Sequence, residues 1–247
     1  MIKTVVFDLD GTVYLGNEII ENVLEVISSL EKNNVRIIYF TNNSTKTRKA
    51  ILDKLINFGL NVSLDQIYTS AYLTAIYLKQ KNMNNVFLIG SDGFKEELNF
   101  KNINIVDELD AQAVVIGLKM DFTYNDIAKG LISILNGAKI IASNVDANFP
   151  VENGNVKPGT NAIVAALVAA SCKNIDYIVG KPNIFFLKTI MHKYDLKKDE
   201  IWIIGDRIES DIKMAKNYGC NSILVDTKGE KMLEVFNIIF KGRGQVK

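Results

Sequence analysis

The sequence has little cysteine, proline and histidine, with two, three and one of these residues among 247. Cys172 and Cys220 lie far apart and form no C-x-x-C pair, which argues against a disulfide framework or a cysteine zinc site. The histidine, His192, lies in a helix-period stretch with no partner nearby in the sequence, so a histidine phosphatase or a serine triad is not expected.

Charge of one sign is also lacking, because 29 Lys and Arg face 28 Asp and Glu. Neither nucleic acid nor an anionic membrane is therefore expected as a partner. No apolar run approaches the ~18 residues of a membrane span, and the opening MIKTVVFDLD has no long apolar stretch typical of a secretory leader. We expect a cytoplasmic protein, whose 48% hydrophobic residues suffice for a substantial core.

Apolar runs of strand length alternate with helix-period segments at both ends of the chain. The first part contains strands over 4–8 and 36–41 and helices over 22–33 and 47–58. This βαβα order predicts an α/β fold with a Rossmann-like parallel sheet covered by helices. The last part repeats the pattern, with expected strands over 201–205 and 222–226 and expected helices over 211–219 and 230–240.

The middle of the chain contains a second alternation. Strands are expected over 86–90, 113–117 and 139–143, with helices over 124–135 and 160–171. Its length suits a small domain of its own. We therefore expect a core formed by residues 1–80 and 177–247, with residues 81–176 inserted as a smaller α/β cap domain.

Polar residues follow four of the expected strands, at the point where each strand ends. Ligands of an open α/β sheet bind at the carboxyl ends of its strands. If the four strands are parallel neighbours, their polar tips meet in one crevice. The residues concerned are Asp8 and Asp10, then Thr41 to Ser44, then Lys181 after the run YIVG (177–180), and Asp206 with Asp211 after the run IWIIG (201–205).

Such a crevice holds more carboxylates than cations, so it favours a bound metal ion. Carboxylate and carbonyl oxygens suit Mg²⁺, while a lysine and the free N–H groups of a helix start suit a phosphate. One carboxylate of the Asp8 and Asp10 pair can attack phosphorus and become an aspartyl phosphate. The other can give a proton to the leaving oxygen and later take one from water. Gly11 permits the sharp turn after the strand.

Four motifs in this order resemble those of the haloacid dehalogenase superfamily. They are DLDGT (8–12), Thr41 within FTNNS, Lys181 within VGKP, and GDRIESD (205–211). Between the second and third motifs, GLKMDFTY (117–124) and SNVDANFPVENG (143–154) resemble the α/β cap of the NagD-like, 4-nitrophenylphosphatase branch. The resemblance covers essentially the whole chain.

This resemblance implies a role for each matching residue. Asp8 would be the nucleophile and Asp10 the general acid and base. The ligands of Mg²⁺ would be Asp8, the Asp10 carbonyl and Asp206, with Asp211 binding the ion either directly or through a water molecule. The implied phosphate-binding residues are Thr41, Asn42, Asn43 and Lys181, and Asn144 and Asp146 of the cap are candidate substrate contacts.

The sequence departs from the branch at two cap positions. Lys119 stands where an acidic residue usually follows Gly-Leu, and Asn161 stands where a glycine is expected. Both departures leave the chemistry intact and bear on the substrate pocket. The expected substrate is a small phosphorylated metabolite of the sugar phosphate, nucleotide or phosphoglycolate type. Members of the family often form homodimers, and no feature of the sequence decides the oligomeric state.

Other interpretations remain open at this point. A dehalogenase is a weaker rival, because a halide leaves without a proton and such an enzyme has no need of Asp10. A receiver-like phospho-aspartate module also phosphorylates an aspartate beside Mg²⁺, and a phosphate sensor without turnover could keep the same residues. Thr41 to Ser44 could be a helix N-cap cluster, and Asp211 could serve the helix dipole alone.

Overall fold

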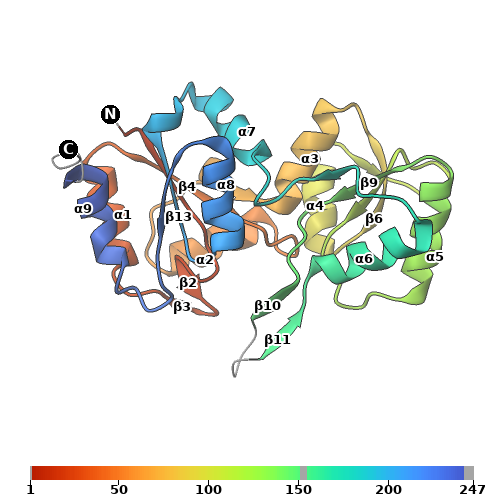
Figure 1. Cartoon of the computed structure of the whole chain (residues 1–247), viewed down its shortest axis with the longest axis horizontal. Coiled ribbons are helices and arrows are strands. Elements are labelled where there is room, and N and C mark those ends of the chain that lie inside the picture. Colours follow the sequence, from red (N-terminus) through yellow and green to blue (C-terminus); the bar gives the residue numbers. More distant parts are fainter. Residues whose placement is uncertain (1, 151–154, 242–247) are drawn as a thin grey trace. The chain divides into compact units, whose positions relative to one another are not determined.

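The computed structural model describes residues 2–150 and 155–241 (Figure 1). The chain divides into two compact units. Unit 1 comprises Met1–Thr41, Leu52–Tyr68 and Lys181–Lys247, and unit 2 comprises Asn42–Ile51 and Thr69–Gly180. Residues 151–154, the end of the cap segment quoted above, lie outside the described residues. Within the described ranges, no helix combines the length and the apolar character that crossing a membrane requires.

Unit 1 is built on a five-stranded sheet in the order β14-β13-β1-β4-β5. The central strand β1 is fully buried and runs parallel to both β13 and β4, with Val5 opposite Trp202 on one side and Ile37 on the other. The chain builds the sheet outward from β1 to β5 and later returns to the other side of β1. The strand order therefore reverses at β1, which is where an open α/β sheet binds ligands. The strands of this sheet are β1 (Thr4–Phe7), β4 (Arg36–Thr41), β5 (Ile67–Thr69), β13 (Ile201–Gly205) and β14 (Asn221–Leu224).

Helices flank this sheet, and α1 shows why. Its buried residues Val23, Val26, Ile27 and Leu30 recur at helical spacing and form one apolar face. Figure 1 shows α1 and α9, from opposite ends of the chain, side by side. The helices outside unit 2 are α1 (Val23–Lys32), α7 (Phe185–Tyr194), α8 (Lys213–Tyr218) and α9 (Met232–Lys241), together with α2 (Arg48–Asn57), which starts in the unit 2 segment and ends in unit 1.

Several short elements complete unit 1. The hairpin of β2 (Tyr14–Leu15) and β3 (Glu18–Ile19) follows the first aspartates. The expected helix over 211–219 begins as a π-helical turn, Ile208–Ile212, and continues as α8. Single 3-10 turns cover Leu64–Gln66 and Lys198–Glu200, each directly before a strand.

Unit 2 contains a second parallel sheet, in the order β12-β9-β8-β6-β7. The strands are β6 (Asn85–Ile89), β7 (Asn104–Ile105), β8 (Ala113–Ile116), β9 (Lys139–Ala142) and β12 (Tyr177–Ile178). The helices are α3 (Ser70–Gln80), α4 (Asp92–Phe100), α5 (Tyr124–Leu135) and α6 (Thr160–Ser171). A separate antiparallel pair, β10 (Asn148–Pro150) and β11 (Val156–Pro158), precedes α6. The predicted α/β fold with parallel sheets is confirmed.

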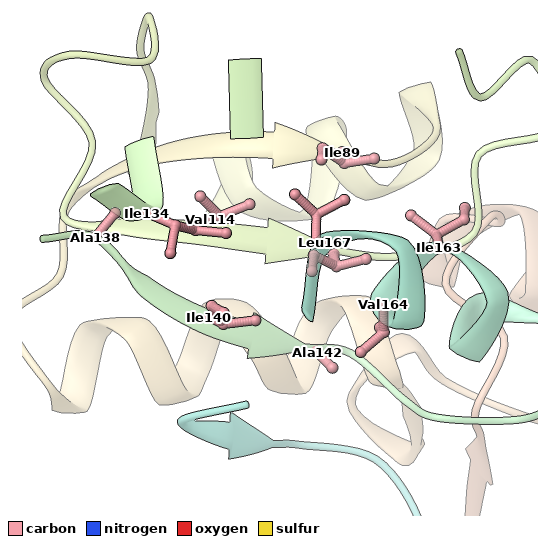
Figure 2. Packing of buried hydrophobic residues seen from close by; sticks show 10 residues of the cluster. Ile89, Val114, Ile134, Ala138, Ile140, Ala142, Ile163, Val164 and Leu167 are labelled. Carbon is pink, nitrogen blue, oxygen red and sulfur yellow. The ribbon is translucent and has the colours of Figure 1, made fainter. Parts of the chain in front are cut away.

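The core of unit 2 lies between its sheet and the pair α5 and α6. Figure 2 shows Leu167 and Val164 of α6 among strand residues that include Val114 and Ile140, all at most 1% exposed. Ile134 of α5 belongs to the same cluster. A polar residue at any of these positions would be buried without a hydrogen-bond partner, so the apolar periodicity of residues 124–135 and 160–171 is a packing requirement.

The expectation that the run 177–180 neighbours the first strand is wrong. Tyr177 and Ile178 form β12, which pairs with β9 in the sheet of unit 2. The ring of Tyr177 stacks on that of Tyr77 of α3, with centroids 4.2 Å apart and planes 7° from parallel. This aromatic contact and the pairing with β9 tie the strand to unit 2. Lys181, three residues further on, is the first residue of the last segment of unit 1.

Candidate active site

Strand β1 and the turn that follows it set the positions of Asp8 and Asp10. The Asp8 N–H donates to the carbonyl of Ile204 at 2.9 Å, which extends the pairing with β13, and Asp8 is 6% exposed. The chain then turns at Gly11, whose φ of +94° is open to glycine and costly for other residues. A Cβ at Gly11 would lie 2.3 Å from Oδ2 of Asp206. The turn therefore depends on glycine both for its backbone angle and for room beside Asp206.

Lys181 reaches the first strand although its own strand lies in unit 2. Its ammonium group pairs with the Asp8 carboxylate and lies 2.7 Å from Oδ1 of Asp211. It also donates to the carbonyl of Phe40 in β4 at 3.3 Å, and the residue is 3% exposed. The Lys181 ammonium group is thus held by oxygen atoms from three segments of unit 1. The peptide bond between Lys181 and Pro182 is cis.

The end of β13 brings two further carboxylates to the same place. Asp206 is half-buried and accepts a hydrogen bond from Thr12 Oγ1 at 3.3 Å. Asp211 lies on the π-helical turn, is fully buried, and accepts from the N–H of Arg207 and from Ser210 Oγ, both at 3.2 Å. Oxygen atoms of Asp8, Asp206 and Asp211 lie within 4.8 Å of one another. The structure therefore gathers these three acids and Lys181, as the sequence predicted.

Burial and like charges shape the titration of this cluster. Burial raises the pKa of Asp8 well above its usual value, Lys181 opposes the rise, and the carboxylates of Asp211 and Asp206 add to it. Burial also raises the pKa of Asp206, with a further contribution from Asp211. For Lys181, burial lowers the pKa, but the two carboxylates outweigh it and the pKa lies above its usual value, so the ammonium stays charged.

The cluster therefore has the properties of a divalent cation site. Three carboxylates close together share one buried ammonium group, which leaves an excess of negative charge. Hard carboxylate oxygens at this spacing are the donors that Mg²⁺ and similar ions prefer. The residues present fit a divalent metal ion.

Asp10 has a different environment, with Thr41, Tyr14 and Lys54 around it. Thr41 Oγ1 donates to Asp10 Oδ2 at 3.4 Å, and the Tyr14 hydroxyl also interacts with the same carboxyl group. Asp10 keeps contact with solvent, yet loss of hydration around its carboxyl raises its pKa, against the effect of Lys54 and Lys181. Burial and the nearby acids raise the pKa of Tyr14 far above its usual value, so its hydroxyl keeps its proton.

Sequence reasoning missed Tyr14 and Lys54. Neither residue matches a catalytic pattern, because Tyr14 belongs to a short apolar stretch and Lys54 is one of several charged positions of a helix. Their place at Asp10 depends on how the β2–β3 hairpin and α2 pack.

Four further predicted site residues lie in unit 2, and three of them, Asn42, Asn144 and Asp146, contact one another there. The Asn42 carbonyl accepts from Ser70 Oγ at 2.7 Å and from Asn144 Nδ2 at 2.8 Å, and the Asn42 amide donates to both oxygens of Asp146. The Asn43 Oδ1 accepts from the N–H groups of residues 45 and 46 and so forms the turn before α2. Asn144 is buried, and its side-chain amide donates to the main chain at Asn42.

The two cap departures also have defined contacts. Lys119 forms an ion pair with Asp126 Oδ1 at 2.7 Å and lines a shallow cavity of ≈ 230 Å³ together with Lys157, Phe122 and Ile163. Asn161 donates its main-chain N–H to the carbonyl of Asp146 at 3.1 Å. Lys119 is therefore held by a carboxylate of its own unit.

Comparison with known proteins agrees with this fold and site. Residues 5–104 match the family model described as haloacid dehalogenase-like hydrolase, and residues 178–236 match one described as HAD-hydrolase-like. The sugar-phosphatase AraL of Bacillus subtilis is 34% identical over 232 residues, covering 93% of this chain and 85% of that protein.

Two solved structures are similar over nearly their whole length. The p-nitrophenyl phosphatase from Archaeoglobus fulgidus gives a TM-score of 0.87 at 30% identity, covering 95% of this chain and 92% of that one. The 4-nitrophenylphosphatase from Thermotoga maritima gives 0.86 at 33% identity, covering 92% and 86%.

Fold and site together define a haloacid dehalogenase-like hydrolase, and the chain belongs to that family. Within it, the chain is a phosphatase of the NagD-like, p-nitrophenylphosphatase type, and so a phosphoric monoester hydrolase. The resemblance predicted from four short motifs is confirmed.

Proposed function

We propose that this phosphatase uses Mg²⁺ and hydrolyses small phosphate monoesters through an aspartyl phosphate on Asp8. The observation that carries the proposal is the buried Asp8 carboxylate, paired with Lys181 and lying beside Asp206 and Asp211. A buried carboxylate next to a fixed cation is suited to attack on phosphorus, because it is poorly hydrated and already oriented.

The reaction would use this chain's residues in two steps. First, a carboxylate oxygen of Asp8 bonds to phosphorus while the ester P–O bond breaks and Asp10 gives its proton to the leaving oxygen. Then a water oxygen attacks the same phosphorus, Asp10 takes the water proton, and the bond between phosphorus and Asp8 breaks. Lys181 offsets the negative charge of the non-bridging oxygens in both steps.

The proposed metal ligands are Asp8, Asp206 and Asp211, together with the main-chain carbonyl of Asp10. When bound, Mg²⁺ supplies a Lewis acid that stabilises charge on the phosphoryl oxygens. The three side chains support this assignment by their spacing and their excess negative charge.

The remaining assignments follow the family resemblance. Thr41, Asn42, Asn43 and Lys181 are proposed to bind phosphate, and Asn144 and Asp146 stay candidate substrate contacts. Because one relative is named a sugar phosphatase, sugar phosphates are the first substrates to test, followed by nucleotides and phosphoglycolate. Action in the cytoplasm and pairing as a homodimer stay predictions.

The direct test is release of p-nitrophenol from p-nitrophenyl phosphate with Mg²⁺ and with EDTA. We expect Asp8→Asn to lower turnover by more than about a thousandfold, because no aspartyl phosphate can form. Asp10→Asn should lower kcat by about a hundredfold, because the second step loses its base. EDTA should remove activity and Mg²⁺ should restore it.

Asp53→Asn is the matched control, since Asp53 is an exposed carboxylate of α2. It should keep the activity of the unmodified chain. Full activity of Asp8→Asn, or turnover that EDTA leaves unchanged, contradicts the mechanism. Phosphate binding without turnover in any divalent metal would indicate a sensor, and a stable phosphoryl group on Asp8 would indicate a receiver-like module.

A further inference from the structure

Tyr14 links Asp10 to the hairpin of β2 and β3. The main chain of Tyr14 pairs with that of Asp10 in an isolated β-bridge, and its carbonyl accepts from the N–H of Gly11 at 2.8 Å. Its own N–H donates to the carbonyl of Leu9 at 3.1 Å. The residue is 3% exposed, and its hydroxyl interacts with the Asp10 carboxyl. Main chain and side chain of Tyr14 therefore both act on the residue proposed as general acid and base.

Lys54 of α2 in turn holds Tyr14. Its ammonium nitrogen lies 3.7 Å from the centroid of the Tyr14 ring, within the range of a cation–π contact. The same nitrogen donates to the carbonyl of Gly16 at 2.6 Å, in the turn that joins β2 and β3. Lys54 thus contacts the ring and the turn of one hairpin. The ring of Phe58, one helical turn further along, packs on Tyr14 with centroids 5.8 Å apart.

The Asp10 carboxyl consequently has two hydroxyl partners, Thr41 and Tyr14. A carboxyl with one hydrogen bond can still rotate about its χ2 bond, whereas two donors on different elements define one orientation. We propose that Tyr14, held by Lys54, is a positioning residue that orients the Asp10 carboxyl for proton transfer to the leaving group. This inference rests on the proposed function, in which Asp10 protonates the departing oxygen.

Proton transfer is needed most when the leaving group is a strong base. A nitrophenolate leaves readily without a proton, while the more basic phenolate requires one. The value of kcat/KM covers only steps up to departure of the leaving group, so it separates this step from the later attack of water. A poorly oriented Asp10 should therefore lower kcat/KM for phenyl phosphate more than for p-nitrophenyl phosphate.

The experiment measures kcat/KM for both esters, and for other substituted phenyl phosphates between them, with saturating Mg²⁺. Tyr14→Phe removes one oxygen and keeps the ring that packs on Lys54 and Phe58. We expect it to lower kcat/KM about tenfold for phenyl phosphate and less than about twofold for p-nitrophenyl phosphate. Lys54→Met should also lower kcat/KM more for phenyl phosphate than for p-nitrophenyl phosphate. The Tyr14 ring then loses its cation–π contact, and the β2–β3 turn loses its hydrogen bond from Lys54.

Tyr39→Phe is the matched control. Tyr39 of β4 is also a buried tyrosine of unit 1, at 1% exposed, and has no part in the proposed site. The same loss of a hydroxyl should leave the ratio of the two kcat/KM values unchanged. Melting temperatures of all variants identify any that fail to fold. If Tyr14→Phe fails to fold, the comparison of the two esters is made with Lys54→Met.

A second measurement asks whether Tyr14 acts through Asp10. The double variant of Asp10→Asn and Tyr14→Phe should behave like Asp10→Asn alone, because the hydroxyl has no carboxyl left to orient. Equal losses for both esters in Tyr14→Phe, or additive losses in the double variant, would overturn the positioning role.

The proposed function fails in a different way. If Asp10→Asn itself leaves the dependence on the leaving group unchanged, Asp10 is not the acid, whatever Tyr14 does. If Asp10→Asn steepens that dependence while Tyr14→Phe and Lys54→Met match the unmodified chain, Asp10 keeps its role and the inference about Tyr14 is wrong.

Discussion

At the scale of single residues, Gly11 carries two constraints in one position. Its φ of +94° excludes most side chains, and a Cβ there would meet the Asp206 carboxylate at 2.3 Å. The second constraint is specific to the site, because Asp206 is one of the three acids of the proposed metal site. The effect of backbone strain can be separated from the effect of displacing Asp206 by comparing alanine substitutions at two glycines with positive φ.

We expect Gly11→Ala to weaken metal activation, since Asp206 must move to admit the methyl group. The Mg²⁺ concentration for half-maximal activity should rise by about tenfold or more, equivalent to about 1.4 kcal/mol of metal binding. Gly59→Ala is the control, because Gly59 has a similar φ of +89° and nothing within 4 Å of an added Cβ. Its stability should fall, while the Mg²⁺ requirement stays the same. Equal Mg²⁺ requirements in both variants would contradict this account.

The same scale shows what a sequence can predict about a site. Asp8, Asp206 and Asp211 could be brought together in advance, because each follows a recognisable strand in a fixed motif. Lys181 could be added only through the family motif VGKP, because the strand before it lies in the sheet of unit 2. Tyr14 could not, because its contact with Asp10 depends on a hairpin of two-residue strands and on a lysine of α2. Such contacts have no periodicity, so no pattern in the sequence indicates them.

At the scale of elements, the segment from Asn42 to Ile51 packs as part of unit 2 although it is far from the rest of that unit in sequence. Three contacts hold it. Arg48 and Glu97 form a buried ion pair at 3.1 Å, and the Asn42 carbonyl accepts from Asn144 and Ser70. The segment therefore depends on buried polar partners, which are costly to leave unpaired.

Asn144→Ala should loosen this segment by removing one of the two donors to the Asn42 carbonyl. Because Ser70 still donates to this carbonyl, we expect a loss of about 0.5–1.5 kcal/mol, the net contribution of one hydrogen bond. Amide hydrogen exchange should become faster in residues 42–51 and unchanged in α5, which has its own capping box at Thr123 and Asp126. Unchanged exchange in the segment would show that Ser70 and the Arg48 pair suffice.

Elements also differ in how well the sequence predicts them. The helices over 124–135 and 160–171 have the predicted ends, because a capping Thr123 and Gly159 stand at their starts. The sequence does not predict that the strand of Tyr177 and Ile178 pairs with β9, because two apolar residues carry no information about their partner strand. The stacking of Tyr177 on Tyr77 decides it, and that contact joins distant positions.

At the scale of the whole molecule, the acids of the site should make stability depend on pH and on metal. In the metal-free protein the folded state raises the pKa of Asp8 above its usual 3.8. The folded state then holds this proton more tightly than the unfolded chain, so the contribution to stability is complete below pH 3.8 and is lost as the pH rises through the folded pKa.

The free energy of unfolding in EDTA should therefore fall as the pH rises above about 4, relative to that of Asp8→Asn, which has no carboxyl at this position to titrate. Added Mg²⁺ should reduce this fall, because it binds the ionised carboxylates of the folded state. Urea unfolding followed by Trp202 fluorescence measures it, since Trp202 is the one tryptophan and lies in β13. If the free energy of unfolding depends on pH in the same way in both proteins, the folded state does not raise the pKa of Asp8.

The pairing of β1 with β13 has a consequence for biosynthesis. During translation Asp8 and Asp10 emerge well before the partner strand, Lys181, Asp206 and Asp211. Until then one edge of β1 is open, and an open strand edge invites pairing with other chains. Most of unit 2, from Thr69 to Gly180, is translated as one continuous block in the meantime. Translation that stalls before Asp211 would thus release a chain prone to aggregate and without catalytic power.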